Sequence, residues 1–270
     1  MLYYLHLLSD AWSPLRLFRY ISFRVLMAAL TAMVFSLVLG PWIIRKLTEM
    51  KLGQPIRTAE EVHWLHELHR QKKGIPTMGG VLIIMAVFLS VGLWARPDTV
   101  LVWLAMGAMV GLGALGFADD YLKVARKQSR GLSARAKLLG QLAIALIVGT
   151  ILLWHPETSS SAQLLMVPFY KYPVALHLGL FFLALAGLVV VGASNAVNLT
   201  DGLDGLAIGC TITVSSVYAI LAYLASNTKF CAYLQLTHVA GAGELAVTCA
   251  ALLGASMGFL WHNCHPARVF

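Results

Sequence analysis

The sequence predicts an all-α polytopic membrane protein, and three observations lead to that fold class. The chain of 270 residues is 59% hydrophobic and only 12% charged, with a mean hydropathy of +0.76, whereas soluble domains are roughly 25% charged. Its apolar residues are gathered into runs of about 17 to 25 residues, the length that spans a hydrocarbon core. Most lysines and arginines lie between these runs, so a soluble globular domain is excluded.

We expect seven transmembrane helices, which form a single integral-membrane domain over residues 1–270. Before the first span, Trp12, Arg16, Arg19 and Tyr20 predict an interfacial helix, because aromatic and basic residues favour the membrane surface. In chain order, the predicted spans are Phe23–Ile44, Gly79–Ala95, Thr99–Ala118, Leu138–Trp154, Ala175–Ala193, Leu206–Ala225 and Leu245–Trp261.

The distribution of basic residues predicts the orientation of these spans. Seven spans place residues 45–78, 119–137, 194–205 and the tail after residue 262 on one side, and these segments hold 14 of the 20 lysines and arginines. Positive residues favour the cytoplasmic side, so this side is predicted to be cytoplasmic and the N-terminus periplasmic. The net charge of +8 then reflects topology and attraction to lipid headgroups, and it does not indicate a nucleic-acid partner.

The stretch NAVNLTDGLDGLA, residues 195–207, separates two apolar runs that contain no charged residue. One continuous helix over residues 175–225 would be about 76 Å long, far more than a hydrocarbon core of roughly 30 Å. We therefore expect a break at the membrane surface. Its polar residues recur every third position, so a short helical turn would display them on one side: Asn195, Asn198, Asp201 and Asp204. The alternative is that one aspartate caps the next helix.

In FADDYLKVARK, Asp119 and Asp120 end the third predicted span, and Lys123, Arg126 and Lys127 follow. Adjacent carboxylates can hold Mg²⁺ or move a proton, and the cations can hold phosphate oxygens. The alternative is a solvated span end in which a carboxylate pairs with Lys123.

In KKGIPTMGG, Pro76 is predicted to begin the helix that contains the second span. Backbone N–H groups near Thr77 and Gly79 would then form an anion site beside Lys72 and Lys73; the alternative is a plain Pro-Gly helix start. With the aspartate motifs, this pattern indicates a cytoplasm-facing cleft for phosphoryl transfer from a soluble anionic donor to a membrane lipid. The rival functions are an anionic-solute transporter and a non-catalytic truncated remnant.

The motif Gly254-Ala-Ser256-Met-Gly258 matches the nucleophile elbow of hydrolases. That elbow requires a preceding strand, whereas this motif lies inside an apolar span. We therefore do not expect Ser256 to be a nucleophile.

These motifs, together with GFLWHNCHPARVF at the end of the chain, resemble the bacterial phospho-N-acetylmuramoyl-pentapeptide transferase family of the polyprenyl-phosphate N-acetylhexosamine-1-phosphate transferase superfamily. The resemblance implies transfer of phospho-N-acetylmuramoyl-pentapeptide from UDP-MurNAc-pentapeptide to undecaprenyl phosphate. The products would be lipid I and UMP, the cofactor Mg²⁺ and the location the bacterial inner membrane. Another UDP-N-acetylhexosamine donor remains an alternative, and a homodimer is left open.

The same resemblance implies roles for individual residues. The catalytic positions are Asp119, with the role of base, Asp120 and Asp201. Substrate-binding positions are Lys72, Thr77, Lys123, Lys127, Asn198, Asn263 and, around the uracil, Gly202, Leu203, Asp204 and Phe270. The family continues beyond Phe270 with Met-Gly-Asp, whose aspartate is the principal Mg²⁺ ligand, so Asp119, Asp120 and Asp201 are expected to contribute to that metal site. The chain is expected to be a C-terminally truncated member, with seven of about ten family helices.

Overall fold

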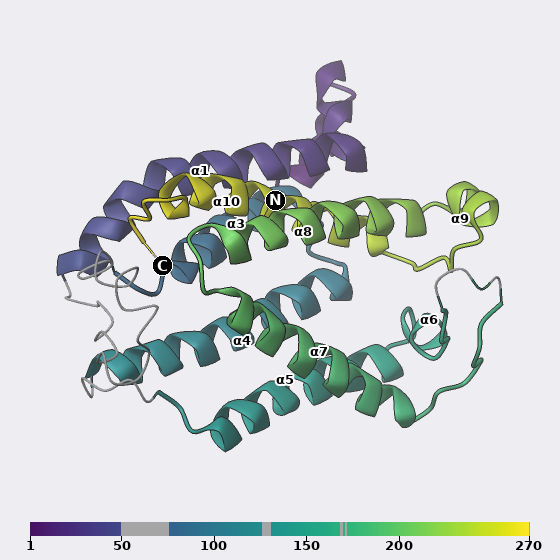
Figure 1. Cartoon of the computed structure of the whole chain (residues 1–270). Helices are drawn as coiled ribbons and strands as arrows, with labels where there is room; N and C mark the ends of the chain where they lie inside the picture. The colour runs from purple at the N-terminus through teal and green to yellow at the C-terminus, as the bar shows by residue number, and fades with distance from the viewer. Residues whose placement is uncertain (50–75, 126–130, 168–169, 171, 270) are drawn as a thin grey trace.

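A computed structural model describes residues 1–49, 76–125, 131–167, 170 and 172–269, and within these ranges the secondary structure is helical (Figure 1). Two 3₁₀ helices come first, η1 (Leu2–Leu8) and η2 (Ser13–Arg19), at the place of the predicted interfacial helix. The α-helices are α1 (Ile21–Glu49), α3 (Gly80–Trp94), α4 (Val100–Ala125), α5 (Ala134–Trp154), α6 (Ser159–Ala162), α7 (Phe181–Thr200), α8 (Leu206–Ala225), α9 (Thr228–Leu234) and α10 (Ala242–Asn263).

The prediction of an all-α polytopic membrane protein is confirmed. Among the described residues, six helices are long and apolar enough to cross a membrane, namely α1, α4, α5, α7, α8 and α10. The remaining predicted span corresponds to α3, which has 15 residues and is therefore only about 22 Å long. Helix α3 is shorter than expected at its start, because the chain at Met78 has a left-handed backbone (φ 72°).

The position predicted for the fifth span is wrong by about six residues. Helix α7 begins at Phe181 and not at Ala175, and it continues to Thr200 instead of ending at Ala193. The residues before it are held in another arrangement, because the N–H groups of Val174 and Leu178 donate to the carbonyl oxygens of Leu165 and Gln163. The break between α7 and α8 is accordingly confined to residues 201–205.

Helix α10 packs closely along α1 (Figure 1). On α1, small buried residues recur every fourth position, at Ala28, Ala32, Ser36 and Gly40. A Cβ atom added at Gly254 of α10 would lie 1.9 Å from the carbonyl oxygen of Ala29, so only glycine fits this contact. The motif that matches a nucleophile elbow is thus part of a helix-packing surface, as small residues often are in membrane helices.

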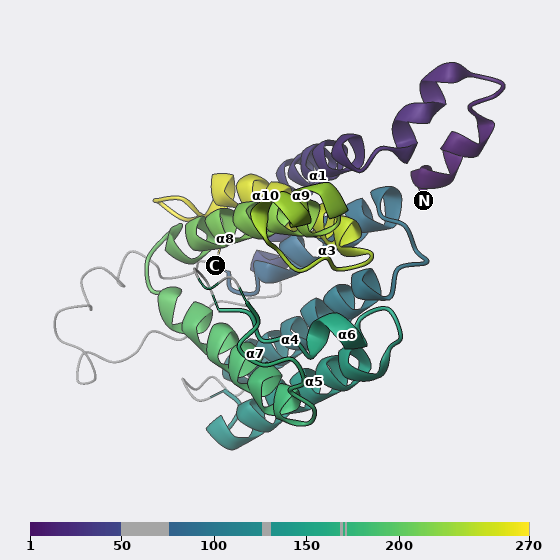
Figure 2. The same cartoon turned by 90° about the vertical axis from the view of Figure 1, so that its right-hand side faces the viewer.

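The helices form two groups, seen one above the other in Figure 2: α1, α3, α8 and α10, and below them α4, α5 and α7. In the first group α10 is central, and 61% of its apolar window is buried. In the second group the corresponding share for α7 is only 6%. The outward apolar side chains of α7 suit contact with lipid tails.

A buried ion pair that we did not predict ties the first group together where α1 begins. The Arg24 guanidinium donates to both carboxylate oxygens of Glu244 in α10, each at 2.7 Å, and to the carbonyl oxygen of Trp94 at 3.1 Å. Glu244 also accepts the backbone N–H of Arg96, and the Tyr3 ring lies 4.9 Å from the Arg24 guanidinium. Charged side chains within membrane helices are expensive unless paired, so an arginine early in the first span could have prompted a search for an acidic partner.

Candidate active site

Most of the described residues predicted for the site lie at one end of the bundle, at the left of Figure 1. We name this the Asp119 end, and the opposite end, where α1 begins, the Arg24 end. Successive spanning helices run in opposite directions, so α4, α7 and α10 all finish at the Asp119 end, while α3, α5 and α8 begin there. The alternation therefore brings motifs from distant parts of the chain to one end.

Asp119, Asp120 and Lys123 form an ionic cluster in the last turns of α4. The Lys123 ammonium lies 2.7 Å from an Asp119 carboxylate oxygen and 2.9 Å from one of Asp120. The spacings of three and four residues place these side chains on one helix face. Asp119 is the less exposed carboxylate, with 13% of its side chain accessible against 31% for Asp120. Both carboxylates thus contact the same ammonium group.

The second oxygen of Asp119 is held by the start of α5. Its Oδ1 accepts the backbone N–H of Leu132 at 2.8 Å, while Oδ2 faces Lys123. Directly after Leu132, Ser133 caps α5 by accepting the N–H of Ala136. Two different elements therefore fix the two oxygens of the carboxylate predicted to be the base.

Helix α5 also carries two site residues that the sequence analysis missed. The Lys137 ammonium donates to Asn198 Oδ1 of α7 at 3.1 Å, and the amides of Gln141 and Asn195 bond to each other one turn further along. Gln141 is only 3% exposed. A polar residue at this depth in an apolar helix needs a partner, and the spacing of four residues between Lys137 and Gln141 was the available signal.

The α7–α8 connection joins the site to the end of α10. Gly205, with φ 78°, precedes α8 and donates its N–H to Asn263 Oδ1 at 3.1 Å. The Asn263 amide donates in turn to the carbonyl oxygen of Val269 at 2.8 Å. Asp204 accepts from the backbone N–H of Ala267 and lies 3.1 Å from the His265 ring nitrogen. Leu203, beside it, is exposed, and Gly202 donates to the carbonyl oxygen of Thr200.

One expectation about residues 195–207 is wrong, and the alternative to it is also excluded. Asn195 and Asn198 lie within α7 and face α5, whereas Asp204 contacts the segment after α10, so the polar residues are not displayed on one side. Asp201 terminates α7, and the residue at the N-cap of α8 is Gly205. Capping of α8 by an aspartate therefore does not explain the motif.

The motif around Thr77 also differs from expectation. Helix α3 begins at Gly80, four residues after Pro76, and the N–H groups of Val81 and Leu82 bond back to Met78 and Gly79. Thr77 is buried, with 4% exposure. The anion site proposed for this turn stays a prediction. Three predicted substrate-binding residues lie outside the described residues: Lys72, Lys127 and Phe270.

The described residues contain no group of three acidic, histidine or cysteine side chains arranged to hold a metal ion. Asp119 and Asp120 nevertheless converge on one cationic group, the Lys123 ammonium. Mg²⁺ is commonly bound through one or two carboxylates, with substrate phosphates and water completing its shell. The pair fits such a site in the chemistry of its oxygen donors, while the contribution of Asp201 stays a prediction.

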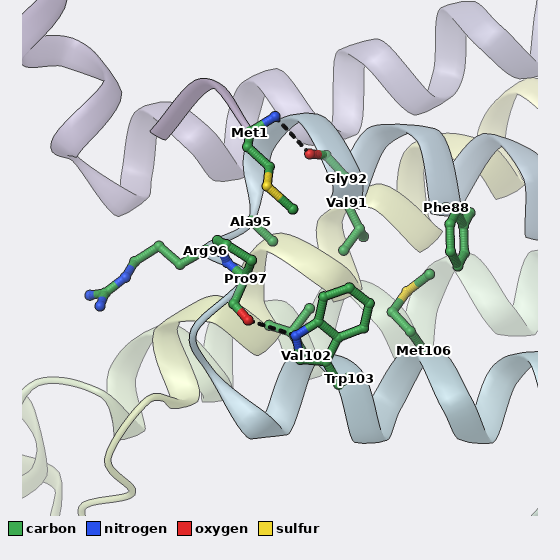
Figure 3. Close-up of a pocket in the computed structure, with 10 residues that line it drawn as sticks. All are labelled: Met1, Phe88, Val91, Gly92, Ala95, Arg96, Pro97, Val102, Trp103 and Met106. Atoms are coloured by element: carbon green, nitrogen blue, oxygen red, sulfur yellow. Dashed lines mark hydrogen bonds between the residues drawn. The ribbon is translucent and has the colours of Figure 1, made fainter. Parts of the chain in front are cut away.

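An apolar pocket lies at the Arg24 end, between the end of α3 and the beginning of α4 (Figure 3). Phe88, Trp103 and Met106 line it, and the guanidinium of Arg96 points away from it. The Trp103 indole donates to the carbonyl oxygen of Pro97 at its edge. Because none of the predicted site residues lines this pocket, we do not assign it to the candidate active site.

Comparison with known proteins agrees with the resemblance. The model of glycosyl transferase family 4 matches residues 100–270, and the first signature of phospho-N-acetylmuramoyl-pentapeptide-transferases matches residues 72–84. Several relatives bear the name phospho-N-acetylmuramoyl-pentapeptide-transferase. The relative from Methylacidiphilum infernorum is 48% identical over all of this chain and 74% of its own length. The relative from Syntrophus aciditrophicus is 48% identical over all of this chain and 73% of its own length. A Neisseria meningitidis relative is 46% identical over 97% of this chain and 71% of its own length. The chain therefore belongs to the phospho-N-acetylmuramoyl-pentapeptide-transferase family.

Proposed function

We propose that this protein transfers phospho-N-acetylmuramoyl-pentapeptide from UDP-MurNAc-pentapeptide to undecaprenyl phosphate, which yields lipid I and UMP for peptidoglycan synthesis. The observation that carries the proposal is the cluster of two carboxylates on one lysine at the end of a multi-pass bundle, in a chain whose relatives bear the transferase name. A lipid acceptor reaches such a site from the membrane, and a nucleotide sugar reaches it from water.

In the proposed reaction, an oxygen of the lipid phosphate attacks the β-phosphorus of the nucleotide sugar. The bond from that phosphorus to the oxygen bridging to the α-phosphorus breaks, and UMP leaves with the electron pair. Asp119 accepts any proton remaining on the attacking phosphate, while Lys123 and Lys137 stabilise negative charge on the phosphates. A route through an Asp119-linked phosphosugar uses the same residues. UMP release equal to the amount of enzyme, with no lipid acceptor present, would identify that second route.

Mg²⁺ is the cofactor we propose, with Asp119, Asp120 and Asp201 contributing ligands beside the phosphate oxygens. When bound, it neutralises charge on the pyrophosphate. Asn198, Gly202, Leu203, Asp204 and Asn263 would bind the nucleotide, with Asp204 and Leu203 beside the uracil. Thr77, and outside the described residues Lys72, Lys127 and Phe270, complete the proposed substrate-binding set.

We further propose that the Asp119 end faces the cytoplasm across a bacterial inner membrane, since basic residues flank the spans on that side. In a background without native cysteines, Glu60→Cys and Arg130→Cys should react with impermeant maleimide only from the cytoplasmic side. Ser160→Cys should react only from the periplasmic side. Labelling of position 130 from the periplasm would contradict the orientation.

The function is tested with the protein expressed from its whole reading frame and purified in detergent. UMP release should require UDP-MurNAc-pentapeptide, undecaprenyl phosphate and Mg²⁺, and UDP-N-acetylglucosamine should be a poor substitute for the donor. Equal turnover of the second donor would shift the assignment to another member of the superfamily. Absence of UMP release with every donor would contradict the proposal.

A further inference from the structure

We propose that Gly131 is a positioning residue for the reaction, because the absence of a side chain there lets the Leu132 N–H hold Asp119 in one orientation. This inference rests on the proposed function, in which the Asp119 carboxylate takes part in the chemistry. It concerns Gly131 and Leu132, directly before α5, which none of the sequence motifs identified as functional.

The orientation of Asp119 depends on two contacts from opposite sides. Lys123, one turn later on the same helix, holds Oδ2 at 2.7 Å, and the Leu132 N–H holds Oδ1 at 2.8 Å. The lysine is a flexible point charge that moves with its partner, whereas a backbone N–H has a fixed direction. The Leu132 bond is therefore the contact that sets the rotation of the carboxylate.

The close approach needed for this bond leaves no space for a side chain at position 131. A Cβ atom on Gly131 would lie 2.2 Å from Asp119 Oδ1, 2.8 Å from its Cγ and 2.8 Å from its backbone carbonyl oxygen. Rotation of the aspartate side chain would relieve the first two contacts but not the third. Gly131 is not among the described residues with positive φ, so the requirement is for space and not for an unusual backbone conformation.

The segment that follows Gly131 is anchored, so it cannot simply move aside without consequence. The Ser133 hydroxyl oxygen accepts the N–H of Ala136, and the Ser133 carbonyl oxygen accepts the N–H of Lys137. Lys137 in turn bonds to Asn198 on α7. A displacement at position 131 would thus separate Leu132 from Asp119 while α5 keeps its position against α7.

Gly131 and Leu132 are only half-buried, and Gly131→Ala should therefore leave the fold intact. The expected effect is on the chemical step: kcat falls about ten- to a hundredfold, since small misplacements of reacting groups have effects of this size. KM for the nucleotide sugar should change less than threefold. The matched control is Gly116→Ala, on the same helix as Asp119, where an added Cβ would meet nothing within 4 Å.

A second pair of variants changes the hydrogen-bond donor while glycine stays at position 131. Leu132→Pro removes the N–H donor and leaves Gly131 in place, while Leu132→Ala keeps the donor. Leu132→Pro should reproduce the loss of kcat, and Leu132→Ala should behave as wild type. If Gly131→Ala fails to fold, as judged by gel filtration and thermal unfolding, this pair decides the proposal.

A readout without substrate distinguishes this inference from the proposed function. The backbone N–H of Leu132 is protected from exchange with solvent deuterium while it donates to Asp119. Its exchange rate, measured by NMR or mass spectrometry, should rise several-fold in Gly131→Ala and in Asp119→Ala and stay at the wild-type level in Gly116→Ala. If wild type releases no UMP, the proposed function fails while this comparison still decides the inference. An unchanged exchange rate at Leu132 in Gly131→Ala and Asp119→Ala would overturn it.

Discussion

The ionic clusters at the two ends of the bundle are built in opposite ways. At the Arg24 end, Arg24 and Glu244 belong to different helices and are almost fully buried, with side-chain exposures of 1% and 6%. At the Asp119 end, Asp119, Asp120 and Lys123 belong to one helix, and their side chains are 13–31% exposed. One cluster connects α1, α3 and α10, whereas the other leaves its carboxylates within reach of water.

This difference separates a cluster that supports folding from one available for chemistry. Removing one partner of a buried pair typically destabilises a protein by about 3–5 kcal/mol, because an unpaired charge remains inside. Pairs three or four residues apart on a helix surface contribute only about 0.3–0.5 kcal/mol. Stabilisation of the bundle therefore does not explain why three charged residues lie at the end of α4, whereas the proposed catalytic role explains it.

The largest expected effect comes from removing the negative charges of the proposed catalytic set. Asp120→Asn and Asp201→Asn should each lower the rate of UMP release by about 10²–10⁴-fold, the range for loss of a positioned acid–base group. Their thermal unfolding in detergent should match wild type, and Asp98→Asn at the Arg24 end serves as control. Near-normal rates of UMP release in both variants would show that the carboxylates at the Asp119 end are not needed for the reaction.

The corresponding change at the Arg24 end should act on stability. Glu244→Gln leaves the Arg24 guanidinium without its anionic partner and should destabilise the fold by about 3–5 kcal/mol. The double variant Arg24→Met/Glu244→Leu should recover most of that loss, because neither charge remains buried. Thermal unfolding measures both, with the exposed pair Lys46 and Glu49 replaced by alanine as control. An unchanged midpoint in Glu244→Gln would contradict the folding role.

A smaller effect is expected from Lys137, which touches the site through Asn198. Lys137→Met removes a charge-assisted hydrogen bond of 3.1 Å and should lower kcat/KM about tenfold, since such bonds are worth about 1.5–3 kcal/mol. Arg135→Met, two residues earlier on α5, should leave kcat/KM unchanged. Equal losses in both variants would show that the basic character of α5 matters and not the bond to Asn198.

The smallest expected effect concerns Asp98, an exposed carboxylate between α3 and α4. The hydrogen bond from Arg96 lowers the pKa of Asp98 despite an opposing effect of burial. Because the folded pKa lies below the unfolded value, the pair stabilises the protein at neutral pH, and this contribution is lost as the pH falls through about 4 and below. Exposed pairs contribute about 0–1 kcal/mol. The difference in unfolding midpoint between wild type and Asp98→Asn should therefore be small at pH 7 and shrink as the pH falls below about 4.

The sequence predicts the fold class and most spans because uninterrupted apolar runs of this length have few structural alternatives. It misplaces the start of α7 because Val174 and Leu178 are as apolar as the residues of the helix, and their backbone bonds to residues 163–165 leave no trace in hydropathy. It also misses the start of α3, since an L-residue with positive φ such as Met78 is rarely expected from sequence.

In the site, the motifs give the residue types but not the partners. Asp119 and Lys123 are four residues apart, so their contact could be anticipated. The contact between Asp119 and the Leu132 N–H depends on where Leu132 lies relative to the end of α4. A pattern of side chains does not predict which backbone N–H will donate to a carboxylate. The Arg24–Glu244 pair joins residues 220 positions apart, and only the packing of α10 on α1 brings them together.

The most direct test of the central claim is the formation of lipid I by wild type and Asp119→Asn, compared at equal amounts of folded protein. Radiolabelled UDP-MurNAc-pentapeptide, undecaprenyl phosphate and Mg²⁺ are supplied, and the labelled lipid is extracted and counted. Wild type should form lipid I and UMP in equal amounts, while Asp119→Asn should form at least about a hundredfold less. Equal formation of lipid I by both proteins would show that the carboxylate at the end of α4 is not the reacting group.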